Sequence, residues 1–408
     1  MKDGDKRLTC VPSGNVLVAL LVCFSSACTG PNDAAPAGPA DAASRDAGAP
    51  PRCDKLTVDP ARTQAALDAL VRDQGVAGVQ VYLSLCGKSW SGASGLADIS
   101  TKRRLEAGAL FRGGSTTKTF TAVAVLSLAR DGLLSLEDPI SRWVPNVPRG
   151  SEITVRMVLS NTSGLFNYTD DPVFRASFVN PTRTWTPEEL VGVAVRNPAL
   201  NAPGAGFHYS NTNFVIAAMI AEKVSNSSYA ALVRKAVFAP LGLASSFLPP
   251  AETLPDGLAR GYTWGIKGDG TFDEGYTVGP RIDATFLFDY SHGWGTGNLV
   301  TTGKDETTFI RALRRGQLLP NEWLMQMKPT DQSPEYYGGS RYGLGLMRFP
   351  TPLGFAYGHG GQTFGYLTYM LDIPDVDLTY VISINDDRGS ATTLGVASEN
   401  IVRSMLPE

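Results

Sequence analysis

The sequence has little of what metal, phosphate or nucleic-acid chemistry requires. It contains only three histidines, His208, His292 and His359, and their spacing matches no metal-ligand pattern. It has neither a Gly-x-x-x-x-Gly-Lys phosphate loop nor the Gly-x-Ser-x-Gly elbow that many serine hydrolases carry. Charged residues make up 18% of the chain, the net charge is −3, and no block of like charge indicates a nucleic-acid partner. What is present is a chain of 408 residues, more than one typical domain.

The one apolar run near the start, residues 16–24, is too short to cross a membrane. Basic residues precede it and small residues follow it, which is typical of a secretory signal peptide over residues 1–27. Cys28 stands directly after Ser-x-Ala, which resembles a bacterial lipoprotein cleavage site with Cys28 as the lipidated first residue. The pattern departs at Ser25, where leucine is usual, and cleavage near Ala27 without a lipid is the alternative. We expect export to the periplasm or cell envelope, with membrane attachment through that lipid only.

Cysteine is scarce, and three of the five cysteines lie in the exported segment. Residues 28–53 are rich in Pro, Ala, Gly and Asp and cannot bury enough apolar surface to order themselves, so we expect a flexible linker. Only Cys53 and Cys86 remain for the folded part. An oxidising compartment favours a disulfide between them, and two unpaired buried thiols are the alternative.

Strand patterns gather at both ends of the folded part, with helical patterns between them. A helix expected from Pro60 is followed by an alternating strand over 79–85 and a returning hairpin partner. Toward the C-terminus there are four strand-like runs, at residues 342–348, 355–359, 368–371 and 378–384. A final helix is expected over residues 392–405. One antiparallel sheet made from both ends, with an inserted helical lobe, satisfies that order. We predict an α/β (α+β) fold with an α/β subdomain at 54–134 and 300–408 and a mainly helical subdomain at 135–299.

The stretch most suggestive of chemistry is Gly-Gly-Ser-Thr-Thr-Lys at residues 113–118, which leads into a helical run. Residues three apart on a helix share a face, so Ser115 and Lys118 are expected to point the same way. A serine at a helix start lies near unpaired N–H groups that favour negative charge. Ser115 would then be a nucleophile with Lys118 as its base. The alternative is a capping serine beside a solvated lysine.

Two further segments offer complementary groups. Residues 203–214 precede another helical run and hold Tyr209 and Asn211, a phenol for proton relay and an amide for substrate. Their alternative is a packed aromatic with Asn211 as a helix cap. Residues 357–366 place His359 among glycines, and such glycine density in a strand lets a ligand approach the backbone closely. The alternative here is a structural histidine in a tight turn.

In this order, the three segments resemble the motifs Ser-x-x-Lys, Tyr-x-Asn and Lys/His-x-Gly of the penicillin-recognising serine hydrolases. This family includes the serine D-alanyl-D-alanine carboxypeptidases, the class C β-lactamases and related esterases. The similarity covers nearly the whole folded part, and it looks closest to the soluble DD-carboxypeptidases with histidine in the third motif. It implies a β-lactamase/DD-peptidase-like fold: an antiparallel sheet with flanking helices, joined to an all-helical lobe.

The resemblance also implies a two-step acyl transfer that needs no metal or organic cofactor. Ser115 would attack the substrate carbonyl, and Lys118 and Tyr209 would share the proton work. The sequence leaves open whether Lys118 or a Tyr209 phenolate is the base. The backbone N–H groups of Ser115 and Gln362 would form the oxyanion hole. The substrate would be held by residues of the second and third motifs: Asn211, His359, Gly360 and Gly361.

Two departures concern the carboxylate of a peptide substrate. The closest carboxypeptidases have hydroxyl residues beside the third-motif glycine, where this chain has Gly360 and Gln362. They also place an arginine after a Gly-Leu-Gly-Leu strand, where this chain has Met347. Arg348 follows one residue later, and a one-residue shift on a strand reverses the side-chain face.

The expected activity is that of a D-alanyl-D-alanine carboxypeptidase acting on peptidoglycan stem peptides. A β-lactamase or an esterase of the same family is the alternative, so the expected ligands are peptidoglycan-derived peptides, small acyl substrates and β-lactams. A third hypothesis is an inactive binding protein on the same scaffold. The intact Ser115, Lys118 and Tyr209 argue against it.

Overall fold

The computed structural model describes residues 52–264, 279–336 and 339–407. The predicted signal peptide, the lipidation site at Cys28 and most of the predicted linker lie outside these residues. Within the described ranges, no helix combines the length and the apolar character that crossing a bilayer would need.

Eight strands form the central sheet: β1 (Gly78–Leu85), β2 (Lys88–Asp98), β3 (Arg103–Arg104), β8 (Arg341–Tyr342), β9 (Met347–Thr351), β10 (Gly354–Thr363), β11 (Tyr366–Ile373) and β12 (Leu378–Ile384). Their order is β3-β2-β1-β12-β11-β10-β9-β8, and every neighbouring pair is antiparallel. The two ends of the described chain meet where β1 pairs with β12, with Val79 opposite Ile384. The predicted antiparallel sheet built from both ends is therefore confirmed. Two further short pairs join β4 (Phe111–Arg112) to β7 (Val300–Thr301) and β5 (Tyr262–Thr263) to β6 (Ile282–Asp283).

The α-helices are α1 (Pro60–Gln74), α2 (Thr117–Arg130), α3 (Val155–Leu159), α4 (Pro172–Ala176), α5 (Pro187–Val195), α6 (Asn211–Ser225), α7 (Tyr229–Val233), α8 (Ala239–Leu241), α9 (Gly303–Arg314), α10 (Asn321–Met327) and α11 (Ser390–Met405). Shorter turns are η1 (Gly114–Thr116), η2 (Ile140–Arg142), η3 (Tyr168–Asp170), η4 (Ser177–Val179), η6 (Ser291–Gly293) and η8 (Pro374–Val376), and a π-helical turn, η5 (Arg234–Phe238), continues α7.

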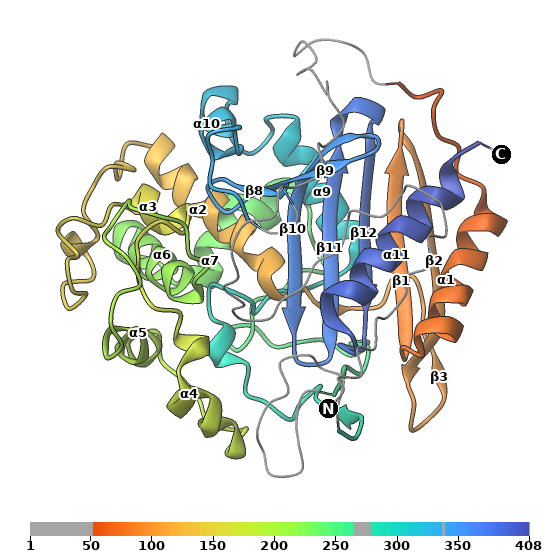
Figure 1. The fold of residues 1–408 in the computed structure, drawn as a ribbon, viewed down its shortest axis with the longest axis horizontal. Helices are drawn as coiled ribbons and strands as arrows, with labels where there is room; N and C mark the ends of the chain where they lie inside the picture. Colours follow the sequence, from red (N-terminus) through yellow and green to blue (C-terminus); the bar gives the residue numbers. More distant parts are fainter. Residues whose placement is uncertain (1–51, 265–278, 337–338, 408) are drawn as a thin grey trace, which may run out of the picture.

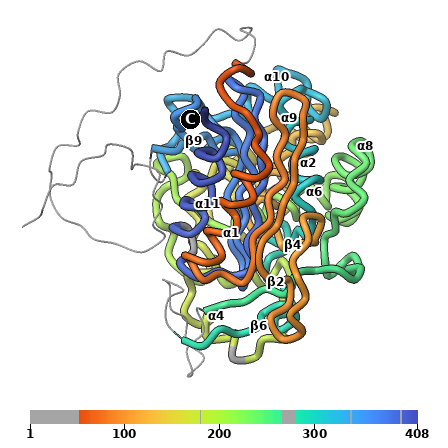
Figure 2. Tube along the Cα trace, turned by 90° about the vertical axis from the view of Figure 1, so that its right-hand side faces the viewer, coloured from red at the N-terminus to blue at the C-terminus, as the bar shows by residue number. Residues whose placement is uncertain are grey.

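The helices lie on both sides of the sheet. Helices α1 and α11 pack together over one face, and α9 packs on the other face against β1, β11 and β12. Figure 1 shows the remaining helices gathered beside the sheet, with α2 and α6 among them. Figure 2, turned by 90°, separates α1 and α11 on one side from α2, α6 and α9 on the other. The residue boundaries of an α/β and a helical subdomain stay a prediction.

Local sequence signals account for several of these elements. Asp59 accepts hydrogen bonds from the first turn of α1, Pro60 occupies its first position, and Gly75 ends it with a φ of 66°. The sequence Thr-Pro-Glu-Glu at residues 186–189 forms a capping box at the start of α5, where the side chains of Thr186 and Glu189 each bond the other's backbone nitrogen.

The predicted strand over 342–348 is wrong as a continuous element. The chain pairs as β8, turns, and pairs again as β9, with the Gly343 nitrogen bonded to the Leu346 carbonyl across the turn. Gly345 sits in this turn with a φ of 66°, and a Cβ there would lie 2.6 Å from the Ala122 Cβ of α2. A side chain would therefore push the turn away from the helix that carries Lys118.

A disulfide joins Cys53 to Cys86, across a sequence separation of 33 residues. Cys86 lies in the turn between β1 and β2, and the chain beside Cys53 is bonded through the Arg52 nitrogen to the Asp375 carbonyl. The bridge therefore fixes the start of the described chain against one end of the sheet.

Candidate active site

The candidate nucleophile lies in a tight turn between β4 and α2. Ser115 is the middle residue of η1, and Gly114 before it has a φ of 54°, which glycine adopts without strain. Lys118 is on the first turn of α2, and its Nζ lies 2.9 Å from Ser115 Oγ. The Lys118 Nζ also donates to the Thr296 carbonyl at 3.0 Å. The serine and lysine thus lie together, as their three-residue spacing predicts.

The Lys118 side chain is wholly buried, at 0% exposure. The alternative of a solvated lysine is therefore wrong. Burial lowers the pKa of its ammonium group well below the usual value, because the charged form loses its hydration. Within the described ranges no carboxylate forms an ion pair with Lys118 that would restore the charge. A neutral amine in this position can accept the hydroxyl proton of Ser115.

Tyr209, in the loop before α6, lies beside Ser115 and Lys118. Its phenol lies near Ser115, and its ring centroid lies 5.0 Å from Lys118 Nζ. Burial raises the pKa of the Tyr209 phenol above its usual value, so the hydroxyl keeps its proton at neutral pH. Of the two bases that the sequence leaves open, these surroundings favour Lys118.

The third motif lies on β10, directly against the turn that carries Ser115. A Cβ placed on Gly361 would lie 1.8 Å from the Gly113 carbonyl oxygen and 3.3 Å from the Ser115 nitrogen. A Cβ placed on Gly114 would lie 2.7 Å from the Gln362 nitrogen. The glycines let two stretches of backbone approach each other, whereas the sequence suggested that they admit a ligand. This packing brings the main-chain nitrogens of Ser115 and Gln362 to neighbouring positions, the arrangement that an oxyanion hole uses.

His359 is buried and held by two hydrogen bonds. Its Nδ1 donates to the Gly360 carbonyl at 2.6 Å. Its Nε2 is therefore the unprotonated nitrogen and accepts a hydrogen bond from the Tyr342 hydroxyl at 3.1 Å. Burial lowers the pKa of His359 to about 3. The ring is therefore neutral and both of its nitrogens are engaged. In the described part of the chain, no cluster of His, Cys, Asp or Glu side chains is suited to hold a metal ion.

Asn211 is the first residue of α6, after an N-cap at Ser210 whose side chain makes no capping hydrogen bond. The cap role considered for Asn211 is therefore wrong. Its Nδ2 donates to Thr169 Oγ1 at 3.2 Å, and its backbone nitrogen donates to Asn167 Oδ1 at 3.0 Å. These bonds orient the amide from the neighbouring η3 loop and leave its carbonyl oxygen as an acceptor.

The arginine after the Gly-Leu-Gly-Leu segment is engaged elsewhere. Arg348 pairs with Tyr357 across β9 and β10, which places it on the same sheet face as His359, two residues along β10. Its guanidinium donates to Asp331 at 2.6 Å and lies 4.3 Å from the centroid of the Phe355 ring. Arg348 therefore lies on the same sheet face as the site, but its contacts with Asp331 and Phe355 hold its guanidinium away from a substrate.

Three tyrosines beside the site were given no role by the sequence interpretation. Tyr342 bonds to the third-motif histidine, and the Tyr336 ring stacks on that of Tyr209 with centroids 5.5 Å apart. The Tyr168 hydroxyl donates to the carbonyl of His292, four residues before Thr296, whose carbonyl accepts from the lysine Nζ. Tyr342 belongs to a segment that resembles the family, but no sequence signal marks the other two, because their roles depend on contacts between distant loops.

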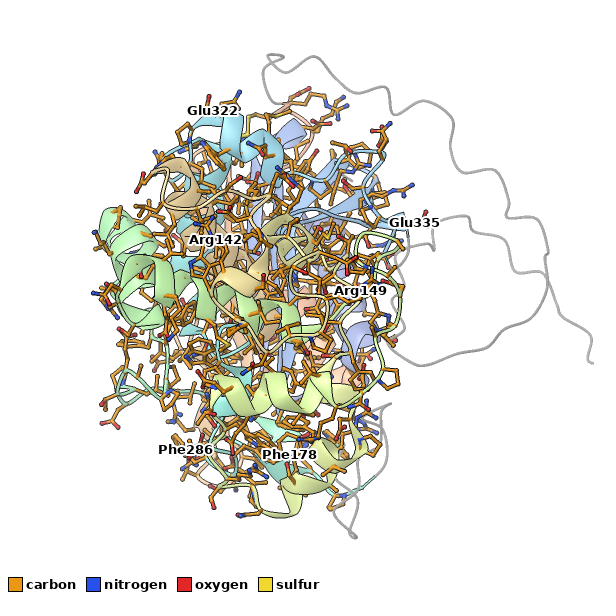
Figure 3. The ribbon with its side chains drawn as sticks, turned by 90° about the vertical axis from the view of Figure 1, so that its left-hand side faces the viewer. Arg142, Arg149, Phe178, Phe286, Glu322 and Glu335 are labelled. Carbon is orange, nitrogen blue, oxygen red and sulfur yellow. A yellow bond between two sulfur atoms is a disulfide. The ribbon has the colours of Figure 1, made fainter. Side chains whose placement is uncertain are left out.

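An aromatic cluster surrounds the tip of the β10–β11 hairpin, just beyond Gln362. The Phe364 ring lies 4.2 Å from that of Phe288 and 5.1 Å from that of Phe178, measured between centroids. Figure 3 shows Phe178 toward the lower end of the helical side. The cluster holds the hairpin tip and with it the adjacent strand end at Gln362.

Comparison with known proteins agrees with this geometry. The family profile described as Beta-lactamase matches residues 63–397. The chain is 28% identical to penicillin-binding protein 4* of Bacillus subtilis (strain 168) over 76% of this chain and 68% of that protein. It is 31% identical to esterase EstB of Burkholderia gladioli over 77% of this chain and 80% of that protein. It is similar in structure to a D-stereospecific amidohydrolase from Streptomyces sp., with a TM-score of 0.73, 32% identity, and coverage of 84% of this chain and 98% of that one.

Proposed function

Since this chain belongs to the beta-lactamase family of serine hydrolases, we propose that it hydrolyses amides of D-configured acyl groups through an acyl-enzyme on Ser115. The observation that carries the proposal is the 2.9 Å contact between Ser115 Oγ and the Nζ of the wholly buried Lys118. A buried amine without a charged partner is the form of lysine that acts as a base near neutral pH.

In the first step, Ser115 Oγ bonds to the substrate carbonyl carbon while its proton passes to Lys118 Nζ. The carbonyl oxygen takes up negative charge beside the N–H groups of Ser115 and Gln362. The carbon–nitrogen bond then breaks, and the leaving amine receives a proton from the Tyr209 hydroxyl, which Lys118 restores. Each oxyanion donor of this kind contributes roughly 3 kcal/mol to stabilising the transition state.

In the second step, water attacks the acyl ester and Lys118 receives its proton through the same contact. The ester bond breaks, Ser115 Oγ takes the proton back, and the carboxylic acid product leaves. The Asn211 side-chain carbonyl oxygen, held in place by the bond from Nδ2 to Thr169, accepts a hydrogen bond from the nitrogen on the acyl side of the substrate in both steps.

The charges around the site support an uncharged leaving group. Lys118 and His359 are both held neutral by burial. Arg348 is paired with Asp331, and the positions that flank Gly361 carry no hydroxyl. A free carboxylate would find no charged partner among these residues, and burying it unpaired is costly. A simple amide has no such requirement, and the likeness to a D-stereospecific amidohydrolase supports the same substrate class.

A substrate panel tests the proposal. We expect ammonia release from D-phenylalanine amide, at least about tenfold slower release from the L-enantiomer, and no release by the Ser115→Ala variant. Equal rates on the two enantiomers would contradict the proposed preference for D-configured substrates. Full activity of Ser115→Ala would contradict the proposed acyl-enzyme on Ser115.

The D-alanyl-D-alanine carboxypeptidase predicted from the sequence is a second candidate. It is supported by the His359-x-Gly361 motif on β10 and by the similarity to penicillin-binding protein 4*. An acylated peptide ending in D-Ala-D-Ala, run beside the amide, separates the two: release of free D-Ala without ammonia from the amide selects the carboxypeptidase. Efficient hydrolysis of a nitrophenyl ester alone would indicate an esterase, and rapid turnover of a chromogenic cephalosporin a β-lactamase.

We also propose that the protein is exported and lipidated at Cys28, as the start of the sequence predicts. Expression in a bacterial host with labelled palmitate should label the wild type and not a Cys28→Ala variant. An unlabelled, secreted wild type would instead indicate ordinary signal cleavage.

A further inference from the structure

A buried carboxyl group that the proposed reaction does not use lies directly behind the nucleophile turn. Glu306 is in the first turn of α9 and is 1% exposed. Its Oε1 lies 2.6 Å from Thr116 Oγ1, which belongs to the residue after Ser115 and is itself fully buried. Among the described residues no basic side chain forms an ion pair with Glu306. A buried carboxylate without a cation is costly, so its placement beside the nucleophile calls for a physical role.

The hydrogen bonds of Thr116 define that role. Thr116 Oγ1 lies 3.2 Å from the Gly113 carbonyl oxygen as well as 2.6 Å from the glutamate. A hydroxyl has one proton, and a carbonyl oxygen only accepts. A three-centre bond would divide the one Thr116 proton between the two acceptors. A neutral Glu306 that donates to Thr116 lets Thr116 donate to Gly113 alone, so that both contacts are full hydrogen bonds. An ionised Glu306 would take the Thr116 proton and leave the Gly113 carbonyl without that donor.

The Gly113 carbonyl is the contact point between the nucleophile turn and β10. A Cβ on Gly361 would lie 1.8 Å from this oxygen, so the carbonyl rests directly on the strand that carries Gln362. The direction of the Gly113 peptide therefore sets the spacing between the turn and the strand.

We propose that Glu306 is a positioning residue, which as a neutral acid holds Thr116 and the Gly113 carbonyl so that Ser115 and the Gln362 N–H keep their spacing. This inference rests on the proposed role of Ser115.

The charged and titratable groups around Glu306 support the neutral form. Burial raises the pKa of Glu306 to about 8; the hydrogen bond with Thr116 opposes this rise, and the neighbouring Asp305 adds to it. Asp305 is itself bonded to the nitrogen of Ser245 and the hydroxyl of Ser246, and Tyr82 of β1 lies against the start of α9.

Burial raises the pKa of Asp305, and Lys304, also in the first turn of α9, opposes that rise. The ionisable groups at the other end of the helix are paired with one another. At its far end Arg311 contacts Asp377, and Arg314 contacts Asp372 and Asp377, so these charges are matched away from Glu306. Lys118, two residues after Thr116 on α2, is held neutral by burial.

The pH dependence of the rate tests the proposal. We expect kcat/KM of the wild type to rise with pH as Lys118 loses its proton and to fall again above about pH 8, where the Glu306 carboxyl ionises. Glu306→Gln keeps a donor for Thr116 but cannot ionise. It should retain the rate at pH 7 within about threefold and lose the alkaline fall. Glu306→Ala should lower kcat about tenfold with little change in KM, the effect of one lost hydrogen bond.

A second pair of variants tests the same chain of bonds without touching the glutamate. Thr116→Val removes the hydroxyl that links Glu306 to the Gly113 carbonyl. It should lower kcat about tenfold and abolish the fall of kcat/KM at alkaline pH. Thr116→Ser keeps the hydroxyl and should restore both. Circular dichroism at each pH confirms that the fall is not unfolding.

The outcomes separate this inference from the function on which it rests. An alkaline fall that persists in both Glu306→Gln and Thr116→Val would overturn the positioning role. Activity that persists in Ser115→Ala would overturn the proposed function, whatever the Glu306 variants show.

Discussion

Replacing Lys118 with methionine tests most directly whether Lys118 is the general base for acylation. Methionine keeps an unbranched apolar stem of similar volume in the buried site, so packing changes little while the proton acceptor is lost. A positioned general base contributes about 10²–10⁴-fold to the rate, which corresponds to roughly 3–5 kcal/mol of barrier. Because Lys118 contacts Ser115 Oγ at 2.9 Å and meets no charged partner, we expect nearly all of this loss to appear in the acylation rate.

Stopped-flow acylation by a chromogenic cephalosporin measures that loss directly. The wild-type rate should rise with pH through the lowered pKa of Lys118, and the methionine variant should show no such rise. Lys118→Arg is the matched charge control: its guanidinium stays protonated and should not restore the rate. A methionine variant within tenfold of the wild type, with an unchanged melting temperature, would refute Lys118 as the base and return the choice to Tyr209.

Two further predictions follow from the packing around the site and the sheet. Replacing Cys53 and Cys86 with alanine should lower the free energy of unfolding by about 4 kcal/mol in urea titrations, from the loop closed across 33 residues; an unchanged midpoint would contradict this. Gly361→Ala should reduce kcat/KM by about 100-fold or more, because its Cβ would overlap the Gly113 carbonyl and shift an oxyanion donor. Gly108→Ala, with open space around its Cβ, is the control that should leave the rate unchanged.

Local chemistry made much of the fold predictable. The helix from Pro60 and the capping box at Thr186 depend on side chains within a few residues, so their sequence patterns suffice. The alternating strand over 79–85 appears as β1, which runs one residue longer at its start. The break between β8 and β9 was missed because the turn at Gly345 is fixed by contact with α2, far away in sequence. Tertiary contacts of this kind leave no local pattern.

The same distinction applies to the candidate site. The contact of Ser115 with Lys118 follows from helical spacing and was predicted from the sequence. The neutrality of His359 was not, because it depends on burial and on Tyr342 from another strand. Glu306 received no role either, since its significance comes from meeting Thr116 across 190 residues of chain.

The central claim is that Ser115 becomes covalently acylated. Intact mass spectrometry after incubation with benzylpenicillin measures this directly, with peptide mapping to locate the modified residue. We predict one penicilloyl adduct on the wild type, mapped to Ser115, and none on Ser115→Ala. An equal adduct on the variant, or an adduct mapped to another residue, would contradict the account.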